Sequence, residues 1–393
     1  MRIAITGASG FIGVALVAHL ADRHDLILLG RDPQRLAAQF GHRFPTFHNT
    51  EALGAFADVD VVVHLAAALP GTLASEAEYQ EANTTLTMNM GEAAAAAHVQ
   101  IFINATTLGW NRNAYSRTKL AAEDGLNYVP GLRVAHIRLP AVYSNNFSGR
   151  LSILNSFPEF LRLPLFQCLG SLRPTASMEH VVFSIDNLIE LRQKGNYIVS
   201  DRQMNNKIYL NLKLFVDYTF SLGVILFFWW LFIFIFFAIR LDSNGPPVFV
   251  QKRVGKDRKI FECFKFRTMH IGTANAATHQ ISEDAITRVG RLLRRTKLDE
   301  LPQVMNILKR DMSLVGPRPC LPVQKELVEA RDELGVYEVL PGLTGLSQVD
   351  GIDMSSPRRL ARSDEYYVAT RNLLTDLMII LRTIAPRKRE DRV

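Results

Sequence analysis

The first 32 residues, MRIAITGASGFIGVALVAHLADRHDLILLGRD (residues 1–32), decide the fold of the N-terminal half. They predict, in order, an apolar strand, a glycine turn, an amphipathic helix and a second strand. Gly7, Gly10 and Gly13 stand where a tight turn, the close approach of a pyrophosphate and helix–strand packing each exclude a side chain. The N–H groups at the start of the helix would then face the phosphate. The stretch therefore predicts a dinucleotide site in an α/β fold.

The end of the second strand bears on the choice of cofactor. In dinucleotide-binding folds that prefer NAD, an acid at this place usually holds the ribose hydroxyls, whereas an arginine accommodates the 2′-phosphate of NADP. The chain has Gly30-Arg31-Asp32 here. Arg31 favours NADP, but the neighbouring Asp32 keeps NAD open.

Three more apolar stretches continue the same architecture. VDVVVHLAAAL, VQIFINATT and RVAHIRLPAVY each predict a strand, and helical stretches separate them, so the sheet should be parallel and wound on both faces. In AYSRTKLAAE, before the last of these strands, Tyr115 and Lys119 lie four residues apart and hence on one face of a helix. There the ammonium group would lower the pKa of the phenol and hold the cofactor ribose.

Taken in order, the glycine pattern, HLAA, NATT, Tyr115 with Lys119, and RLPAVYS resemble the extended short-chain dehydrogenase/reductase family of sugar-nucleotide epimerases, dehydratases and reductases. The resemblance covers residues 1–202, although the part after residue 144 is abbreviated. It implies that Tyr115 is the acid/base, that Lys119 is its partner, and that Thr107, or less favourably Thr106, polarises the substrate oxygen. The residues that it implies for binding NADP, or NAD, are Gly7, Gly10, Phe11, Ile12, Gly13, Arg31, Leu65, Ala66 and Ala67.

The residues after the hydroxyl bear on the reaction. A 4,6-dehydratase of this family needs an Asp-Glu pair there, and this chain has Leu108-Gly109 instead. A reductase or an epimerase is left, and a preference for NADP favours net reduction. We expect reduction at carbon four of a uridine diphosphate 4-keto-6-deoxy amino sugar, with epimerisation as one alternative and a non-catalytic nucleotide-binding domain as another.

Charge is unevenly distributed along the chain. Residues 1–206 hold 16 Lys and Arg against 17 Asp and Glu, whereas residues 207–393 hold 29 against 21. The basic second half favours phosphorylated substrates or anionic lipid headgroups. Nucleic acid is not expected as a partner, since the arginines alternate with acids and no base-stacking platform is evident. Three scattered cysteines and the lack of a signal peptide predict a reduced, cytosolic setting.

An acid pair stands at the end of a basic stretch in this second half. Three arginines and Asp299 recur at helical spacing over residues 288–299, and Pro302 is expected to end that helix just after Asp299-Glu300. An acid pair that faces arginines suits magnesium and a diphosphate, although a solvated helix face with ion pairs has the same pattern. Gly316-Pro317-Arg318-Pro319 adds a stiff loop with another guanidinium group.

KFRTM, LDELPQ, DMSLVGPRP and PGLTGLSQV follow in order and closely resemble the bacterial sugar transferases, which are monotopic phosphoglycosyl transferases. The resemblance covers residues 207–384. It implies that Asp299 attacks the phosphate next to the sugar of a UDP-sugar and releases UMP, after which undecaprenyl phosphate takes the phosphosugar. It also implies that Glu300 holds magnesium. The residues expected to contact substrate phosphate are Lys265, Arg267, Arg294 and Arg318.

An uncharged run over residues 218–239 lies between these two halves. Its 22 residues would form about 33 Å of helix at roughly 1.5 Å per residue, enough to cross a hydrocarbon core of about 30 Å. However, both expected activities need cytosolic substrates, and the flanks are basic on both sides: Lys207 and Lys213 before the run, and Arg240, Lys252 and Arg253 after it. We therefore expect a re-entrant helix that dips into one leaflet.

The sequence lacks the feature that usually bends such a helix. The family that the chain resembles bends this helix at a Ser-Pro pair, and the corresponding residues of this chain are Trp229-Trp230. No proline lies between Lys207 and Gly245, so the usual kink through a lost N–H group and a ring clash is missing.

These patterns predict three parts: a Rossmann-type doubly wound α/β domain over residues 1–203, a re-entrant membrane helix over 204–243, and a mainly α transferase domain over 244–393. The C-terminal stretch YYVATRNLLTDLMIILRTIAPRKRED alternates apolar and polar residues at helical spacing and ends in a basic tail, which suits an interfacial helix or an ordinary terminal one. We expect both domains on the cytosolic face of the bacterial inner membrane. Expected partners are a UDP-sugar, undecaprenyl phosphate and lipid of one leaflet, with a homodimer as an option.

Overall fold

The computed structural model describes residues 1–109, 113–144, 147, 149–272 and 285–384. By its contacts the chain divides into two compact units. The N-terminal unit comprises Met1–Leu163 and Pro174–Asp201. The C-terminal unit comprises Pro164–Arg173 and Arg202–Val393, so a short segment from the last quarter of the first half belongs to it.

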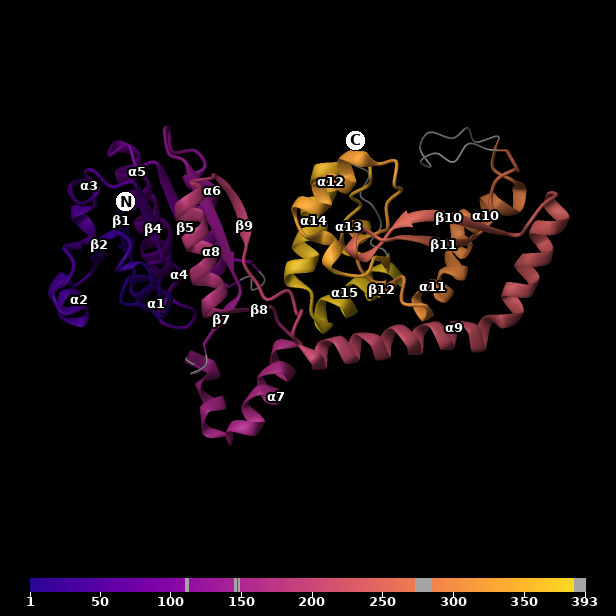
Figure 1. The fold of residues 1–393 in the computed structure, drawn as a ribbon, viewed down its shortest axis with the longest axis horizontal. Coiled ribbons are helices and arrows are strands. Elements are labelled where there is room, and N and C mark those ends of the chain that lie inside the picture. Colours follow the sequence, from indigo (N-terminus) through magenta and orange to yellow (C-terminus); the bar gives the residue numbers. More distant parts are fainter. Residues whose placement is uncertain (110–112, 145–146, 148, 273–284, 385–393) are drawn as a thin grey trace. The chain divides into compact units, whose positions relative to one another are not determined.

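The N-terminal unit is built on a seven-stranded sheet in the order β3-β2-β1-β4-β5-β6-β9, in which every pair is parallel (Figure 1). The predicted parallel α/β fold is confirmed. The strands of this unit are β1 Arg2–Thr6, β2 Asp25–Gly30, β3 Thr46–His48, β4 Val61–His64, β5 Ile101–Thr107, β6 Val134–Leu139, β7 Ala141–Tyr143, β8 Thr175–Ser177 and β9 Gly195–Ile198. Its α-helices are α1 Phe11–Leu20, α2 Pro33–Gln39, α3 Ala52–Ala55, α4 Glu76–Tyr79, α5 Leu86–Ala96, α6 Ala114–Leu126 and α8 Met178–Leu191, while α7 Glu159–Gly170 crosses the unit boundary.

Alternation along the strands divides the core of this unit into two layers. Ile3 and Ile5 of β1 belong to the apolar cluster that includes α1 and α8, whereas Ala4 belongs to the cluster that includes α5. Successive side chains of a strand point to opposite faces, so helices cover the sheet on both sides. The carboxyl ends of the parallel strands therefore meet at one edge, where a site can form.

The C-terminal unit begins with the 36-residue helix α9, Lys207–Asp242. An antiparallel ribbon of β10 Val248–Val254 and β11 Ile260–Phe266 follows, and a short parallel pair is formed by β12 Ser313–Val315 and β13 Gly342–Thr344. The other α-helices of the unit are α10 Arg288–Thr296, α11 Val304–Leu308, α12 Lys325–Glu333, α13 Leu346–Val349, α14 Pro357–Thr370 and α15 Leu373–Ile384. The basic tail predicted after α15 lies outside the described residues.

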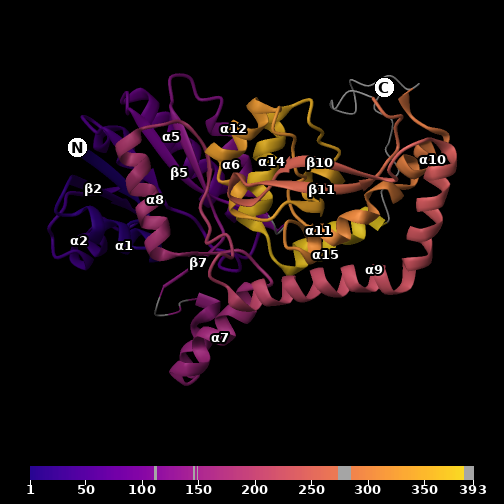
Figure 2. The ribbon, with the colours of Figure 1, turned by 45° about the vertical axis from the view of Figure 1, so that its right-hand side comes forward.

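Helix α9 changes direction sharply part-way along its length, as Figures 1 and 2 both show. Its first part packs on the core through Tyr209 and Ser221, and its last part packs through Ile235 and Ile239. Residues 226–230 are all exposed, which is more than one full turn of helix at about 3.6 residues per turn. The helix therefore leaves the core in its middle and returns to the same unit, and it is long and apolar enough to cross a membrane.

This bend forms without proline. Within the exposed turn, the indole Nε1–H of Trp230 donates to the carbonyl oxygen of Phe227 at 3.1 Å. A bend in a helix weakens the hydrogen bonds of nearby carbonyl groups, and a carbonyl without a donor is costly in an apolar medium. The indole of Trp230 thus donates a hydrogen bond to the backbone of its own helix within the exposed turn.

Candidate functional sites

The glycine turn after β1 leaves room for a ligand at the start of α1. Gly7 has φ +72°, and a Cβ atom there would lie 2.6 Å from the backbone nitrogen of Ala66, so only glycine fits. At Gly10, which caps α1, a Cβ atom would meet only the Gly7 carbonyl oxygen, at 3.2 Å. The chain itself does not fill the space beside Gly10, and this cradle at a helix N-terminus fits a pyrophosphate.

A buried histidine, His64, fixes the end of β4, and the residues that follow it lie beside the glycine turn. His64 Nδ1 lies 2.7 Å from the Thr6 hydroxyl, and His64 Nε2 lies 2.9 Å from the Thr87 hydroxyl. Burial, and then the charge of Lys119, lower the pKa of His64, so the ring is neutral. The Leu65 N–H donates to the Thr6 carbonyl at 3.1 Å, which brings the predicted residues 65–67 beside Gly7. His64 was not singled out from the sequence, although it directly precedes the predicted LAA stretch.

The predicted acid/base residues lie on α6 and at the end of β5. Lys119 is buried, and burial lowers its pKa to about 8. Burial raises the pKa of Tyr115, because the loss of solvent favours the neutral phenol, so the predicted net lowering of this pKa is wrong. The Thr107 hydroxyl accepts a weak bond from the Gly109 N–H at 3.4 Å, while the hydroxyl oxygen of Thr106 is buried without a partner. The spacing of these side chains from a bound substrate stays a prediction.

The two charged residues after β2 have different roles. Asp32 caps α2, since its carboxylate accepts from the Arg35 N–H at 2.9 Å. Arg31 is exposed at the end of β2. The carboxylate that would hold ribose hydroxyls is therefore engaged with the backbone, whereas the guanidinium group lies at the solvent-facing edge.

In the C-terminal unit, two predicted cations meet on one predicted acid. Glu300 Oε1 accepts from Lys265 Nζ at 2.9 Å and from an Arg318 N–H at 2.7 Å. Lys265 comes from β11 and Arg318 from the stiff loop after β12, so three distant parts of the sequence converge. The predicted acid–cation cluster is present, and its chemistry is that of a site for phosphate groups.

The two acids of the pair are held in different electrostatic states. Burial favours the neutral form of Glu300, but Arg318 and Lys265 outweigh it and lower its pKa to about 2. Burial, and then the charge of Glu300, raise the pKa of Asp299. Glu300 is thus a permanent anion, and Asp299 is the more basic carboxylate of the two, which favours a nucleophilic role.

Of the two remaining predicted phosphate ligands, Arg294 lies near this pair and Arg267 lies at the end of α9. Arg294 donates to the Thr268 hydroxyl at 2.9 Å, and its charge is close enough to affect the pKa of Asp299. Arg267 donates to the carbonyl and hydroxyl oxygens of Ser243, at 2.7 and 2.9 Å, just after α9. Its other guanidinium nitrogens, Nε and Nη1, are buried without a partner. Arg267 therefore joins the ribbon to the end of α9, and its contact with substrate stays a prediction.

The predicted continuous helix through the acid pair is wrong. Helix α10 ends at Thr296, because Lys297 takes a left-handed backbone with φ +59° and caps the helix. Asp299 and Glu300 lie in the following 3₁₀ segment, Leu298–Gln303. This change of direction separates the acid pair from the exposed arginines of α10.

Arg253 is a site residue that the sequence reasoning assigned only to the membrane flank. In the β10–β11 ribbon, Gln251 pairs with Cys263 and Arg253 with Phe261, so these alternate residues share a face with Lys265. A small cavity beside Glu300 is lined by Arg253, Cys263, Lys265, Gln303, Arg318, Pro319 and Gly342. The signal that could have found it is the period-two spacing of Gln251 and Arg253 on one strand and of Cys263 and Lys265 on the paired strand.

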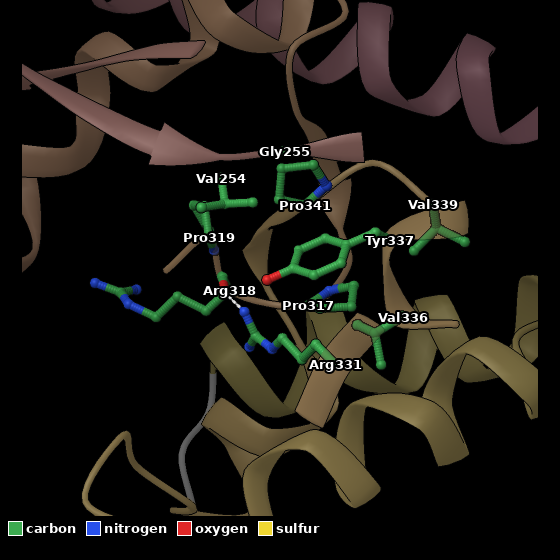
Figure 3. A pocket seen from close by; sticks show the side chains of 10 residues that line it. All are labelled: Val254, Gly255, Pro317, Arg318, Pro319, Arg331, Val336, Tyr337, Val339 and Pro341. Carbon is green, nitrogen blue, oxygen red and sulfur yellow. Dashed lines mark hydrogen bonds between the residues drawn. The ribbon is translucent and has the colours of Figure 1, made fainter. Parts of the chain in front are cut away.

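A buried ion pair supports the loop that carries Arg318. Arg331 and Asp364 are 1% exposed each, and two guanidinium nitrogens of Arg331 lie 3.0 and 2.6 Å from one oxygen of Asp364. Arg331 also donates to the Arg318 carbonyl at 2.9 Å, while Ser347 donates to the other Asp364 oxygen at 2.7 Å. Figure 3 shows Arg331 reaching the backbone of Arg318, whose own side chain extends away.

Replacing Arg331 by methionine should destabilise the C-terminal unit by about 3–5 kcal/mol, because Asp364 would be left as a buried, uncompensated charge. The measurement is thermal or denaturant unfolding of the purified protein in detergent. Arg358→Met, an exposed position of α14, is the matched control and should change stability by less than about 0.5 kcal/mol. A double variant, Arg331→Met with Asp364→Leu, should recover most of the loss; an Arg331→Met protein as stable as the parent would contradict this role.

The acid pair also fits a magnesium ion. Carboxylate oxygens are the ligands that Mg²⁺ prefers, and it commonly takes one or two of them together with substrate phosphates. Asp299 and Glu300 are adjacent, and Glu300 is ionised at all neutral pH values. Glu300 is the residue that would hold the ion, and this assignment stays a prediction.

Family comparisons match both halves of the chain. The model for bacterial sugar transferases matches residues 208–387, and the model for the NAD dependent epimerase/dehydratase family matches residues 3–162. The UDP-glucose:undecaprenyl-phosphate glucose-1-phosphate transferase of Caulobacter vibrioides is 42% identical over 156 residues, which are 37% of this chain and 58% of that protein. The exopolysaccharide production protein ExoY of Sinorhizobium fredii is 36% identical over 172 residues, which are 39% of this chain and 75% of that protein.

Other relatives are matched over shorter shares of their length. The chain spans 36% of an N-acetylgalactosamine phosphotransferase of Aeromonas hydrophila and 37% of a galactose phosphotransferase of Salmonella typhimurium, both acting with undecaprenyl phosphate by name. Among solved structures, UDP-N-acetylglucosamine 4-epimerase from Bacillus cereus is 20% identical with a TM-score of 0.40, over 51% of this chain and 78% of that one.

The two units are an α/β domain with a glycine turn at the start of its first helix and a mainly helical domain that carries an acid pair. The chain belongs to the bacterial sugar transferase family, and residues 3–162 match the model of the NAD dependent epimerase/dehydratase family. Both resemblances predicted from the sequence are confirmed.

Proposed function

We propose that the C-terminal unit is a phosphoglycosyl transferase that moves a sugar phosphate from a UDP-sugar to undecaprenyl phosphate. The observation that carries this proposal is the acid pair itself, in which Glu300 is ionised by two cations while Asp299 keeps a raised pKa. A cation-lined cavity beside the pair suits the diphosphate of such a donor. The names of the transferase relatives agree with this chemistry.

In the proposed first step, a carboxylate oxygen of Asp299 forms a bond to the sugar-linked phosphorus, and the bond from that phosphorus to the UMP oxygen breaks. In the second step, an oxygen of undecaprenyl phosphate attacks the same phosphorus, and the bond to Asp299 breaks. Lys265 and Arg318 would neutralise the phosphate oxygens, and Arg253 would extend this cationic wall. Magnesium, when bound at Glu300, supplies further neutralisation of the diphosphate charge.

We propose that α9 dips into one leaflet of the bacterial inner membrane and returns, so that both units stay on the cytosolic side. Both ends of α9 pack on the same folded unit, while its middle is exposed and apolar. Helix α15 supports an interfacial seat, since Leu374, Leu377, Met378, Leu381 and Ile384 are exposed at helical spacing.

Labelling of introduced cysteines tests this topology. In a Cys168→Ser background, Asn205→Cys and Leu241→Cys lie on the two flanks of α9. An impermeant maleimide should label both in inverted membrane vesicles and neither in intact spheroplasts. Labelling of the two flanks from opposite sides would show a single crossing and end the re-entrant proposal.

For the N-terminal unit we propose an NAD(P)-dependent reductase that makes the sugar donor from a 4-keto precursor. The nicotinamide cofactor would supply a hydride to the keto carbon. Tyr115, protonated because of its burial, would donate its proton to the oxygen of that keto group, and Thr107 would polarise the same oxygen. Lys119 would hold the cofactor ribose and restore the proton of the phenol.

We propose that NADP is preferred over NAD, because Asp32 is engaged as a helix cap and Arg31 is exposed directly after β2. Arg31→Ala should raise the KM for NADPH by about 10–100-fold through the loss of a charge-assisted hydrogen bond. The measurement is cofactor oxidation with a 4-keto sugar nucleotide. The KM for NADH, which lacks the 2′-phosphate, is the internal control and should stay constant; an equal rise for both cofactors would contradict the preference.

The joint activity is tested by supplying candidate UDP-4-keto sugars with NADPH and undecaprenyl phosphate, and by identifying the lipid product by mass. A reduced sugar phosphate on the lipid is expected. Transfer of a sugar phosphate to the lipid without NADPH oxidation would support the alternative, in which the N-terminal domain binds a nucleotide but is not catalytic. Inversion of a 4-hydroxyl group without net oxidation of NADPH would identify an epimerase.

A further inference from the structure

We propose that α7 and the loop after it are a second membrane-contacting element, which inserts its apolar side chains at the same lipid surface as α9. This inference rests on the membrane association proposed above. Helix α7 lies between β7 and β8 in the sequence, and both strands belong to the N-terminal unit. Nevertheless, Pro164–Arg173 packs with the C-terminal unit.

Helix α7 exposes apolar side chains on most of its surface. Phe160 is 77% exposed and Leu163 62% exposed, and Leu161 and Leu169 are exposed as well. Among residues 159–170 only Phe166 and Gly170 are buried. A surface helix of a soluble protein carries polar residues on its outer side, whereas the charged residues of α7 are Glu159 and Arg162, both in its first turn.

The C-terminal end of α7 is held directly against α9. The Asn206 side chain caps α9 by accepting from the Tyr209 N–H at 3.0 Å, and it donates to the Gln167 carbonyl of α7 at 2.9 Å. The buried Gln203 amide donates to the Gly170 carbonyl at 2.6 Å. Figures 1 and 2 show this end of α7 beside the start of α9.

The same segment is also tied to α15. The Leu373 N–H, at the first residue of α15, donates to the Ser171 carbonyl at 2.9 Å. Leu172 is exposed beside this contact, and Arg173 and Lys207 are exposed nearby in the chain. The C-terminal part of α7 is thus anchored to the two helices proposed to contact lipid, and exposed basic side chains suited to anionic headgroups lie close to it in the sequence.

Lipid is a better occupant of this surface than a second protein. A protein partner covers one face of a helix, whereas α7 is apolar and exposed around most of its circumference. At about 1.5 Å per residue its 12 residues extend about 18 Å, too short to cross a bilayer but suited to an interfacial position.

The chain carries a native probe for this proposal. Cys168 lies on α7 and is exposed, at helical spacing from Phe160 and Leu161, while Cys263 and Cys320 are buried. The intact protein, labelled at Cys168 with an NBD fluorophore, is reconstituted in phosphatidylethanolamine–phosphatidylglycerol vesicles with or without doxyl-labelled acyl chains. We expect a blue-shifted emission and loss of most of the fluorescence in the doxyl vesicles. The control is Cys168→Ser with Tyr128→Cys, labelled at a position that is 83% exposed in the N-terminal unit, where no doxyl quenching is expected.

Flotation of the same samples separates this proposal from the function on which it rests. Protein that floats with vesicles but is not quenched at Cys168 overturns the proposal for α7 and leaves the membrane role of α9 standing. Protein that does not float overturns both. Self-quenching between labelled copies without doxyl quenching would assign the surface to a second copy of the chain and also overturn the proposal.

A second variant tests the apolar side chains themselves. Phe160→Asp with Leu163→Asp changes two exposed residues, and we expect it to lose most of the doxyl quenching at Cys168 while the protein still floats through α9. Phe183→Asp, at an exposed position of α8, is the matched control and should keep the quenching. Full quenching in the Phe160 and Leu163 variant would show that the apolar surface does not hold α7 in lipid.

Discussion

Asp299→Asn is expected to lower UMP release and sugar phosphate transfer by about 10⁴-fold or more, because an amide of the same shape cannot form the bond to phosphorus. Burial and the neighbouring Glu300 raise the pKa of Asp299, which makes it the stronger nucleophile of the pair. The measurements are UMP release from a UDP-sugar and the intact mass of the protein after incubation with donor alone. The parent protein should gain one sugar phosphate on Asp299, and the variant none.

Asp257→Asn is the matched control for this loss. Asp257 is exposed in the turn between β10 and β11, with a backbone conformation that asparagine tolerates well, so its variant should keep the parent activity. Continued turnover by the parent enzyme with no sugar phosphate on Asp299 would refute the covalent mechanism.

Tyr115→Phe should lower NADPH oxidation with a 4-keto sugar nucleotide by about 10²–10⁴-fold, since the proton donor for the keto oxygen is removed. Phenylalanine retains the ring that α6 presents, so cofactor binding should change little. The measurement is the decrease of NADPH absorbance under saturating cofactor. UMP release from a ready-made UDP-sugar, measured on the same protein, should be unaffected, because Asp299 and its cations belong to the other unit.

Tyr128→Phe, at an exposed tyrosine just after α6, is the control and should oxidise NADPH at the parent rate. Equal oxidation rates in the parent and in Tyr115→Phe would exclude Tyr115 as the acid. If neither protein oxidised NADPH with any 4-keto sugar nucleotide, the N-terminal domain would be a binding module.

Local sequence patterns predicted the parts of the structure that depend on neighbouring residues. The glycine turn at Gly7 and Gly10 is one example, because its backbone conformation and close approach demand glycine whatever the rest of the fold does. The acid pair and its loop arginine are another, since several motifs in order identified them together. Lys265 and Arg318 both contact Glu300 in the structure.

The features that the sequence did not predict depend on distant contacts or on a single backbone angle. Lys297 ends α10 with a left-handed backbone conformation. Glycine or asparagine usually occupies such a position, so a lysine there gives no sequence signal for the end of the helix. Arg253 joins the site only through the register of the β10–β11 ribbon. The Arg331–Asp364 pair links residues 33 positions apart, and the Trp230 indole donates to the Phe227 carbonyl of its own helix.

The membership of Pro164–Arg173 in the C-terminal unit has a practical consequence for dissecting this protein. The polypeptide passes between the units at three points, after Leu163, after Arg173 and after Asp201. Two enzymes joined end to end could be expressed separately after one cut, but a cut near residue 203 would remove the Gly170 and Ser171 carbonyl groups from the donors Gln203 and Leu373. Recombinant halves should therefore be judged against the full-length protein, with α7 supplied to the transferase half by circular permutation or by coexpression.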